Sequence, residues 1–255
     1  MGIGLPKRLY TARRDAMGLA PSIKFDRPTY AARLIGIDAA NLIRYWKLNE
    51  AAGTTGAGSV LDYSGLGGHA TPTGVTFGSV GIGDGQTGAT FDGSTSRVNV
   101  YSAALNSAFD PNEFTLSAWA LVSNWTSAEI KYIMYIAGTH GAGIYQNAAT
   151  GQLSFLYNTT SAKAISPTGL SYASWFHVAL TVSKAADEMK AYINGSQVGT
   201  TLTGLGTWSG ALSSNNCLVG AAWAIPLNVW NGRIAHAAIW KTPLSAANIL
   251  KLATV

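Results

Sequence analysis

The stretch from residue 175 to residue 199, WFHVALTVSKAADEMKAYINGSQVG, most constrains the fold because it predicts three consecutive antiparallel strands. Apolar side chains alternate with polar or small ones over 176–182 and again over 189–193, which is the period of a half-buried strand. Asn194-Gly195 then predicts a type I′ hairpin turn, since both central residues of such a turn adopt a positive φ. Strands joined in this way form a meander, and its apolar face requires a second sheet to cover it.

The remainder of the chain contains enough strand patterns to supply that second sheet. Residues 114–122 alternate over their whole length and are fairly apolar on both faces, which is typical of a central strand. Shorter patterns recur at roughly 8–12-residue spacing, as in a β sandwich. A short helix is expected at 246–252, with Ser245 as its N-cap. The other expected strands are 42–48, 74–77, 87–91, 96–100, 132–137, 143–146, 152–157, 163–166, 216–220 and 228–240.

The bulk composition narrows the class of protein. At 255 residues, an all-β sandwich is often a single domain, and charged residues make up only 11% of the chain, against about 25% in an ordinary soluble domain. The single cysteine, Cys217, excludes an intrachain disulfide and a cysteine zinc site. No apolar run approaches the ~18 residues of a membrane span, and no secretion signal is visible. This composition favours a particle protein or an extracellular module over a cytosolic enzyme.

The basic charge is concentrated at the N-terminus. Residues 1–40 hold seven basic and three acidic residues, whereas residues 41–255 hold ten basic and nine acidic ones. We therefore predict a basic arm at 1–40 and a single folded domain at 41–255. The arm has three interpretations: a flexible terminus, an extended segment that orders against a partner subunit, or a nucleic-acid-binding tail. Dispersed basic residues without a recognised motif argue against nucleic acid.

The aromatic and apolar residues of the arm favour docking on a protein partner. In this interpretation aromatic side chains are anchors, and arginines pair with an acidic surface. The predicted docking residues are Arg8, Tyr10, Arg13, Arg14, Phe25, Arg27 and Tyr30.

Four segments, in this order and spacing, resemble the laminin-G-like, or concanavalin A-like lectin/glucanase, jelly-roll family. They are residues 45–70, 89–120, 175–199 and 218–252. The resemblance covers about residues 41–255 and implies two antiparallel sheets in jelly-roll order, with Trp119 and Trp175 as buried family tryptophans. The predicted fold class is therefore all-β: a two-sheet antiparallel jelly-roll sandwich with a short C-terminal helix and an extended N-terminal arm.

The resemblance also raises the question of a structural calcium ion, although no cofactor is required by the sequence. Some family members bind calcium through an aspartate such as Asp62, and Asp92 is a second candidate ligand. Where members commonly carry an acidic pair, this chain has Ala235-His236, so a site of six or more oxygens is harder to assemble. The alternative is that both aspartates form Asx turns with their own backbone.

The residues give little support for catalysis. Glucanases of this fold use carboxylates spaced two and four apart on one strand face. Here Asp187 and Glu188 are adjacent, and neighbours in a strand point to opposite faces. No G-x-S-x-G elbow, zinc-protease, P-loop or dinucleotide motif is present. Four histidines and many serines leave a Ser-His-Asp arrangement open, but His177 and His236 lie on strands and are expected to be structural. We predict that the chain is not an enzyme.

Two functions remain. The first is a structural or accessory protein of a large assembly, such as a phage virion surface protein (decoration, head-fibre or tail), docked through residues 1–40 and homo-oligomeric by analogy. The alternative is a carbohydrate-binding or adhesion module that recognises cell-surface glycans by stacking sugars on loop aromatics; the same aromatics could instead pack under loops as core. The glycan-stacking candidates are Trp125, Trp208, Trp223 and Trp230.

Overall fold

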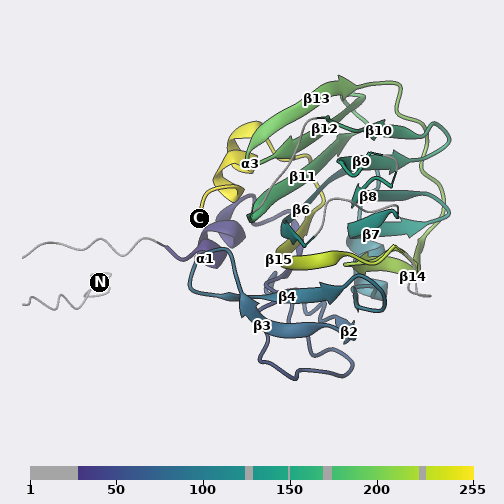
Figure 1. Cartoon of the computed structure of the whole chain (residues 1–255). Helices are drawn as coiled ribbons and strands as arrows, with labels where there is room; N and C mark the ends of the chain where they lie inside the picture. Colours follow the sequence, from purple (N-terminus) through teal and green to yellow (C-terminus); the bar gives the residue numbers. More distant parts are fainter. Residues whose placement is uncertain (1–27, 124–128, 149, 169–173, 224–227) are drawn as a thin grey trace, which may run out of the picture.

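The computed structural model describes residues 28–123, 129–148, 150–168, 174–223 and 228–255, which form two antiparallel sheets packed face to face (Figure 1). The first sheet has eight strands and the second has seven. In order across the first sheet, the strands are β13 (Ser196–Leu202), β12 (Glu188–Ile193), β11 (Phe176–Ser183), β6 (Glu113–Val122), β15 (Asn231–Trp240), β4 (Thr87–Asp92) and β3 (Thr76–Val80), and β1 (Leu42–Trp46) also pairs with β15. The second sheet runs β10 (Lys163–Ile165), β9 (Leu153–Asn158), β8 (Gly141–Gln146), β7 (Lys131–Gly138), β14 (Leu212–Val219), β5 (Arg97–Asn99) and β2 (Thr71–Thr73). The predicted all-β sandwich is confirmed.

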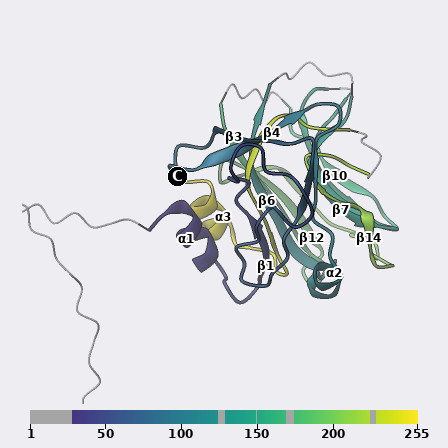
Figure 2. The same ribbon diagram turned by 90° about the horizontal axis from the view of Figure 1, so that it is seen from below.

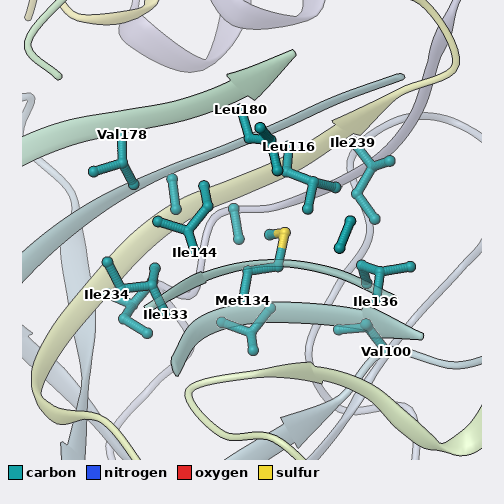
Figure 3. Close-up of a cluster of buried hydrophobic side chains, with 14 of the residues drawn as sticks. Val100, Leu116, Ile133, Met134, Ile136, Ile144, Val178, Leu180, Ile234 and Ile239 are labelled. Atoms are coloured by element: carbon teal, nitrogen blue, oxygen red, sulfur yellow. The ribbon is translucent and has the colours of Figure 1, made fainter. Parts of the chain in front are cut away.

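The core lies between the sheets and is built from the inward-facing residue of every second strand position. Figure 3 shows Leu116 and Leu180 of the eight-stranded sheet facing Met134, Ile136 and Ile144 of the seven-stranded sheet. All five side chains are fully buried. Burying one such side chain stabilises the fold by about 1.5–3 kcal/mol. Because the alternation in the sequence places apolar side chains on the inner face of each strand, their burial stabilises the packing of the two sheets.

The predicted meander and its hairpin are confirmed. Strands β11 and β12 pair antiparallel, and β12 pairs with β13 across the turn. Asn194 has φ 49° and Gly195 has φ 83°, the positive values that a type I′ turn needs. The Asn194 side chain also accepts a hydrogen bond from the backbone N–H of His177 at 2.8 Å. Gly195 has a second role, because a Cβ there would lie 2.7 Å from Leu250 Cδ1 in the C-terminal helix.

Three short helices complete the described residues: α1 (Tyr30–Gly36), α2 (Ala103–Ala108) and α3 (Ala246–Leu252). The predicted C-terminal helix is confirmed, with the Ser245 side chain accepting from the Asn248 N–H. None of the helices among the described residues is long and apolar enough to span a membrane.

Helix α1 corrects the predicted boundary at residue 40. It lies beside α3 on the outer face of the eight-stranded sheet, away from the core (Figures 1 and 2). Tyr30, Leu34 and Ile37 are buried there, at the i, i+4, i+7 spacing of an amphipathic helix. Residues 28–40 therefore belong to the folded body, although the sequence assigned them to the arm.

Tyr30 was predicted to dock on a partner and is instead buried inside this chain. Its hydroxyl donates to the carbonyl of Leu252 at 2.8 Å and accepts from the indole N–H of Trp119 at 2.8 Å. The other six predicted docking residues lie outside the described residues; they are Arg8, Tyr10, Arg13, Arg14, Phe25 and Arg27.

Candidate functional site

The four predicted glycan-stacking tryptophans have different environments. Trp208 is 7% exposed and packs against the ring of Tyr157, and Trp230 is 0% exposed and donates its indole N–H to the Leu121 carbonyl. The prediction is wrong for these two, because their rings fill the core under the loops that carry them. Trp125 lies outside the described residues. Trp223, by contrast, is 39% exposed.

Trp223 is held on a cluster of tyrosines on the outer face of the seven-stranded sheet. Its ring centroid lies 5.5 Å from that of Tyr135 and 6.4 Å from that of Tyr132. Tyr132 in turn stacks on Tyr145, with centroids 4.9 Å apart. The three tyrosines are each less than one tenth exposed, so Trp223 is the member that offers a ring to solvent. These four residues are termed the aromatic platform.

The local structure of β7 and β8 explains why these rings gather on one face. In β8, Tyr145 points outward together with Gly141 and Gly143, while the residues between them enter the core. In β7, a register shift between Tyr132 and Met134 marks a bulge, which places two tyrosines three residues apart on the same face. Sequence analysis missed the tyrosines because strict two-residue alternation assigns Tyr132 and Tyr135 to opposite faces.

The glycines of β8 give the tyrosine rings the space they occupy. A Cβ at Gly143 would lie 2.9 Å from Tyr132 Cε1 and 3.0 Å from Tyr135 Cδ2, and one at Gly141 would lie 2.9 Å from the Tyr135 hydroxyl. The rings therefore lie directly over the β8 backbone. Outward-facing glycines opposite tyrosines in a neighbouring strand are the sequence signal that would have indicated this arrangement.

The electrostatics around the aromatic platform are close to neutral. Burial raises the pKa of Tyr132 and of Tyr135 above the usual tyrosine value, so both hydroxyls stay protonated at neutral pH. Lys131, at the start of β7, lies 3.4 Å from Glu129, and its side chain is 9% exposed. The platform therefore combines an exposed ring, a rigid aromatic support and little charge.

The two predicted metal ligands are occupied by donors within the chain. Asp62 accepts hydrogen bonds from the backbone N–H groups of Tyr45, Ser64 and Gly68 at 2.8–3.0 Å. Asp92 accepts in the same way from the N–H groups of residues 94, 95 and 96, which form a turn around it. Partial burial raises the pKa of Asp92, but these donors and the Thr95 hydroxyl lower it far more.

A calcium ion does not fit these two residues in this conformation. It would have to displace the N–H donors that already bind the carboxylate oxygens. Within the ranges that the structure describes, no group of three or more His, Cys, Asp or Glu side chains is arranged to hold a metal ion. The Asx-turn alternative thus accounts for both aspartates.

The histidines on strands are buried in polar contacts. His177 is fully buried, its Nε2 lies 2.8 Å from Ser117 Oγ, and burial lowers its pKa to about 3. His236 occupies a bulge in β15 with φ 53°; its Nδ1 lies 2.7 Å from the hydroxyl of Tyr45 and its Nε2 lies 3.0 Å from Asp84. Both side chains of the His236–Asp84 pair are almost fully buried, so this Tyr–His–Asp chain is structural.

The adjacent carboxylates in the meander are separated by their partners. Asp187 accepts from the backbone N–H groups of Gly204 and Leu205, whereas Glu188 pairs with Lys190. They do not face a common substrate position. Among the described residues, the aromatic platform combines an exposed aromatic ring with a base of buried aromatic rings.

The comparison with family models decides the classification. Residues 106–250, more than half of the chain, match the model described as the concanavalin A-like lectin/glucanases superfamily. The chain belongs to this superfamily. The resemblance seen in the sequence is thereby confirmed, and strands β6 to β15 lie within the matched region. A comparison with curated protein sequences yields no match.

Solved structures share the fold of this superfamily member at low identity. Domain 4 of AbnA, a GH43 extracellular arabinanase from Geobacillus stearothermophilus in complex with arabinotriose, is 18% identical over 84% of this chain and 98% of that chain, with a TM-score of 0.59. The CBM40 of the Ruminococcus gnavus IT-sialidase, bound to α2,3-sialyllactose, is 12% identical over 66% and 96%, with a TM-score of 0.55. Trypanosoma rangeli sialidase in complex with sialic acid is 14% identical, with a TM-score of 0.63 over 88% of this chain, which spans 36% of the sialidase. These likenesses establish the fold.

Proposed function

We propose that the chain is a glycan-binding module and that the aromatic platform is its binding site. The observation that carries the proposal is the exposed ring of Trp223, held against Tyr132 and Tyr135. Sugar rings present apolar C–H faces that pack on aromatic side chains, while their hydroxyls bind neighbouring polar groups. Membership of the lectin/glucanases superfamily supports this proposal, as do the two similar modules whose structures contain arabinotriose and sialyllactose.

The platform is well suited to binding because its support is rigid. Tyr132 and Tyr135 lie over the glycines of β8, and Tyr145 stacks on Tyr132 from the side. A ring fixed before binding loses little conformational entropy when a sugar stacks on it, which favours affinity.

The test is a glycan array on the intact protein, followed by calorimetry with the best ligand. Trp223→Ala is expected to weaken binding about tenfold, which corresponds to about 1.4 kcal/mol. Leu250→Ala is the matched control, because Leu250 is an apolar residue of α3 that is 55% exposed and lies against Gly195, in the hairpin of the other sheet. Absence of binding to every glycan, or equal affinity of the Trp223 variant and the wild type, would contradict the proposal.

We propose as a second function that residues 1–27 attach the module to a protein subunit of a larger assembly, such as a phage virion surface. This part of the chain holds six basic and two acidic residues. Helix α1 fixes the start of the body directly after it, since the Arg33 guanidinium donates to the Thr254 carbonyl and the Trp240 indole donates to Ile37. The excess of basic over acidic residues in this segment supports the proposed attachment. Co-purification of the intact protein with its assembly, lost when residues 1–27 are deleted, is the result that this proposal requires.

A further inference from the structure

The strands that carry the aromatic platform contain almost no charged residues. The sequence has no Asp, Glu, Lys or Arg from 132 to 162, and none from 191 to 232. These two ranges include most of β7, all of β8, β9 and β14, and Trp223. A chain with 17 basic and 12 acidic residues thus leaves one sheet nearly uncharged.

Glu129 and Lys131 provide the charge at the platform end of this sheet. They form an ion pair at 3.4 Å, in which the Glu129 side chain is 74% exposed and the Lys131 side chain is 9% exposed. The ammonium is therefore largely covered and already paired, while the carboxylate faces solvent. Of these two charges next to β7, the negative one is therefore the more exposed to an approaching ligand.

Arg97 is the arginine on the same sheet, and its strand is not adjacent to the strand that carries Tyr132 and Tyr135. It belongs to β5, which is separated from β7 by β14, and two strand spacings amount to about 10 Å. Its Nη1 donates to the Thr95 carbonyl at 3.1 Å, within the turn that precedes β5. One of the five donors of the guanidinium is thus used within its own turn.

The chemistry of acidic sugars does not suit this surface. Sialic acids and uronic acids carry a carboxylate, which proteins bind through charge-assisted hydrogen bonds, most often from arginine. Removing a carboxylate from water without such a partner is costly. Neutral sugars have no such requirement, since an aromatic ring satisfies their apolar face and amides satisfy their hydroxyls.

We infer that the aromatic platform binds neutral pentose or hexose oligosaccharides and discriminates against sialylated and uronic acid glycans. The inference rests on the proposed glycan-binding function and specifies its ligand class. The fold does not determine this choice, because one similar module is bound to arabinotriose and another to a sialylated sugar. The residues around Trp223 determine it.

The experiment measures binding of the intact protein to arabinotriose, lactose, α2,3-sialyllactose and trigalacturonate at 50 and 500 mM NaCl. We expect at least one neutral sugar to bind, with a Kd that changes less than twofold with salt, and the acidic sugars to bind at least tenfold more weakly. An acidic sugar that binds as tightly as the best neutral one, and loses affinity in Trp223→Ala, would overturn the inference while upholding the proposed function. Absence of binding to all four sugars and to a wider neutral panel would overturn both.

A second experiment reverses the charge at residue 129. Glu129→Arg is expected to strengthen binding of α2,3-sialyllactose at least threefold and to leave the affinity for the neutral sugar within twofold. Glu188→Arg is the matched control, since Glu188 lies on β12 of the other sheet and the variant has the same net charge. No gain in Glu129→Arg, or an equal gain in both variants, would show that local charge near the platform does not set specificity.

Discussion

Gly143 lies directly beneath the ring of Tyr132, so close that a Cβ added to the glycine would stand 2.9 Å from Tyr132 Cε1. Tyr132 lies opposite Tyr145 in the register of β7 and β8, and its ring reaches along the strand to cover Gly143, which lies opposite Tyr135. Because Gly143 has no side chain, the ring of Tyr132 can lie against the β8 backbone. The centroid of this ring is 6.4 Å from that of Trp223. The exposed tryptophan therefore depends on a buried glycine.

Gly143→Ala should reduce both the stability of the fold and the glycan affinity. The added methyl group must push Tyr132 and Tyr135 off the β8 backbone, and overpacking of this kind costs about 1–3 kcal/mol. The displaced rings no longer support Trp223, so we expect a several-fold increase in Kd for the best array ligand, measured by calorimetry. Gly36→Ala is the control, since a Cβ at Gly36 has no atom within 4 Å. Unchanged affinity in Gly143→Ala would show that ring orientation does not matter.

Much of the scaffold was predictable because its signals are local. The meander and the Asn194-Gly195 turn depend on neighbours in sequence, and so does the Ser245 cap. In each case the physical determinant lies within a few residues: side-chain alternation, a positive φ, or a hydroxyl that reaches an N–H. The structure has all three features as expected.

The candidate site was less predictable because it depends on irregular or long-range geometry. The bulge in β7 brings Tyr132 and Tyr135 to one face, and no residue type marks it. Trp208 and Trp230 were candidates for stacking on sugars, with packing under the loops as the alternative. The sequence could not decide between the two, because burial depends on partners far away in the sequence, such as Leu121 for Trp230. For Trp223, the position after a strand correctly indicated an exposed side chain.

Deleting residues 1–27 should leave the body folded, whereas deleting 1–40 should destabilise it strongly. The longer deletion removes Tyr30, Leu34 and Ile37, and burial of each contributes about 1.5–3 kcal/mol as an upper range. It also leaves the indole N–H groups of Trp119 and Trp240 without their acceptors. Chemical denaturation of both truncated proteins tests this expectation. Equal loss of stability would mean that α1 does not contribute to the body.

His177 should make the protein sensitive to mild acid. Burial lowers its folded-state pKa to about 3, whereas an unfolded histidine titrates near ~6.5. Between these two values the unfolded state binds a proton that the folded state does not, so stability falls as the pH falls from about 6.5 towards about 3. For this group the slope is at most about 1.4 kcal/mol per pH unit.

The matched variant for this pH effect is His177→Gln, which keeps a side chain able to bond Ser117 and removes the titration. Its free energy of unfolding, measured by urea denaturation at half-unit pH steps, should vary less than that of the wild type between pH 6.5 and 4. Parallel curves for the two proteins would show that another group is responsible for the acid sensitivity.

Asp84 should affect stability in a separate and lower pH window. Burial raises the pKa of its carboxyl, but the contact with His236 and the N–H of Gln86 lower it more, so the folded-state value lies below the ordinary one. Such a group stabilises the fold above the unfolded pKa of about 3.9, and the contribution is lost as the pH falls through the folded-state value. Asp84→Asn should therefore cost about 1–3 kcal/mol at pH 7, because a neutral amide oxygen replaces the charged acceptor beside His236. The difference in free energy of unfolding between this variant and the wild type should become smaller below about pH 4. A cycle with His236→Gln isolates the pair, and a coupling energy near zero at pH 7 would show that Asp84 and His236 act independently despite their 3.0 Å separation.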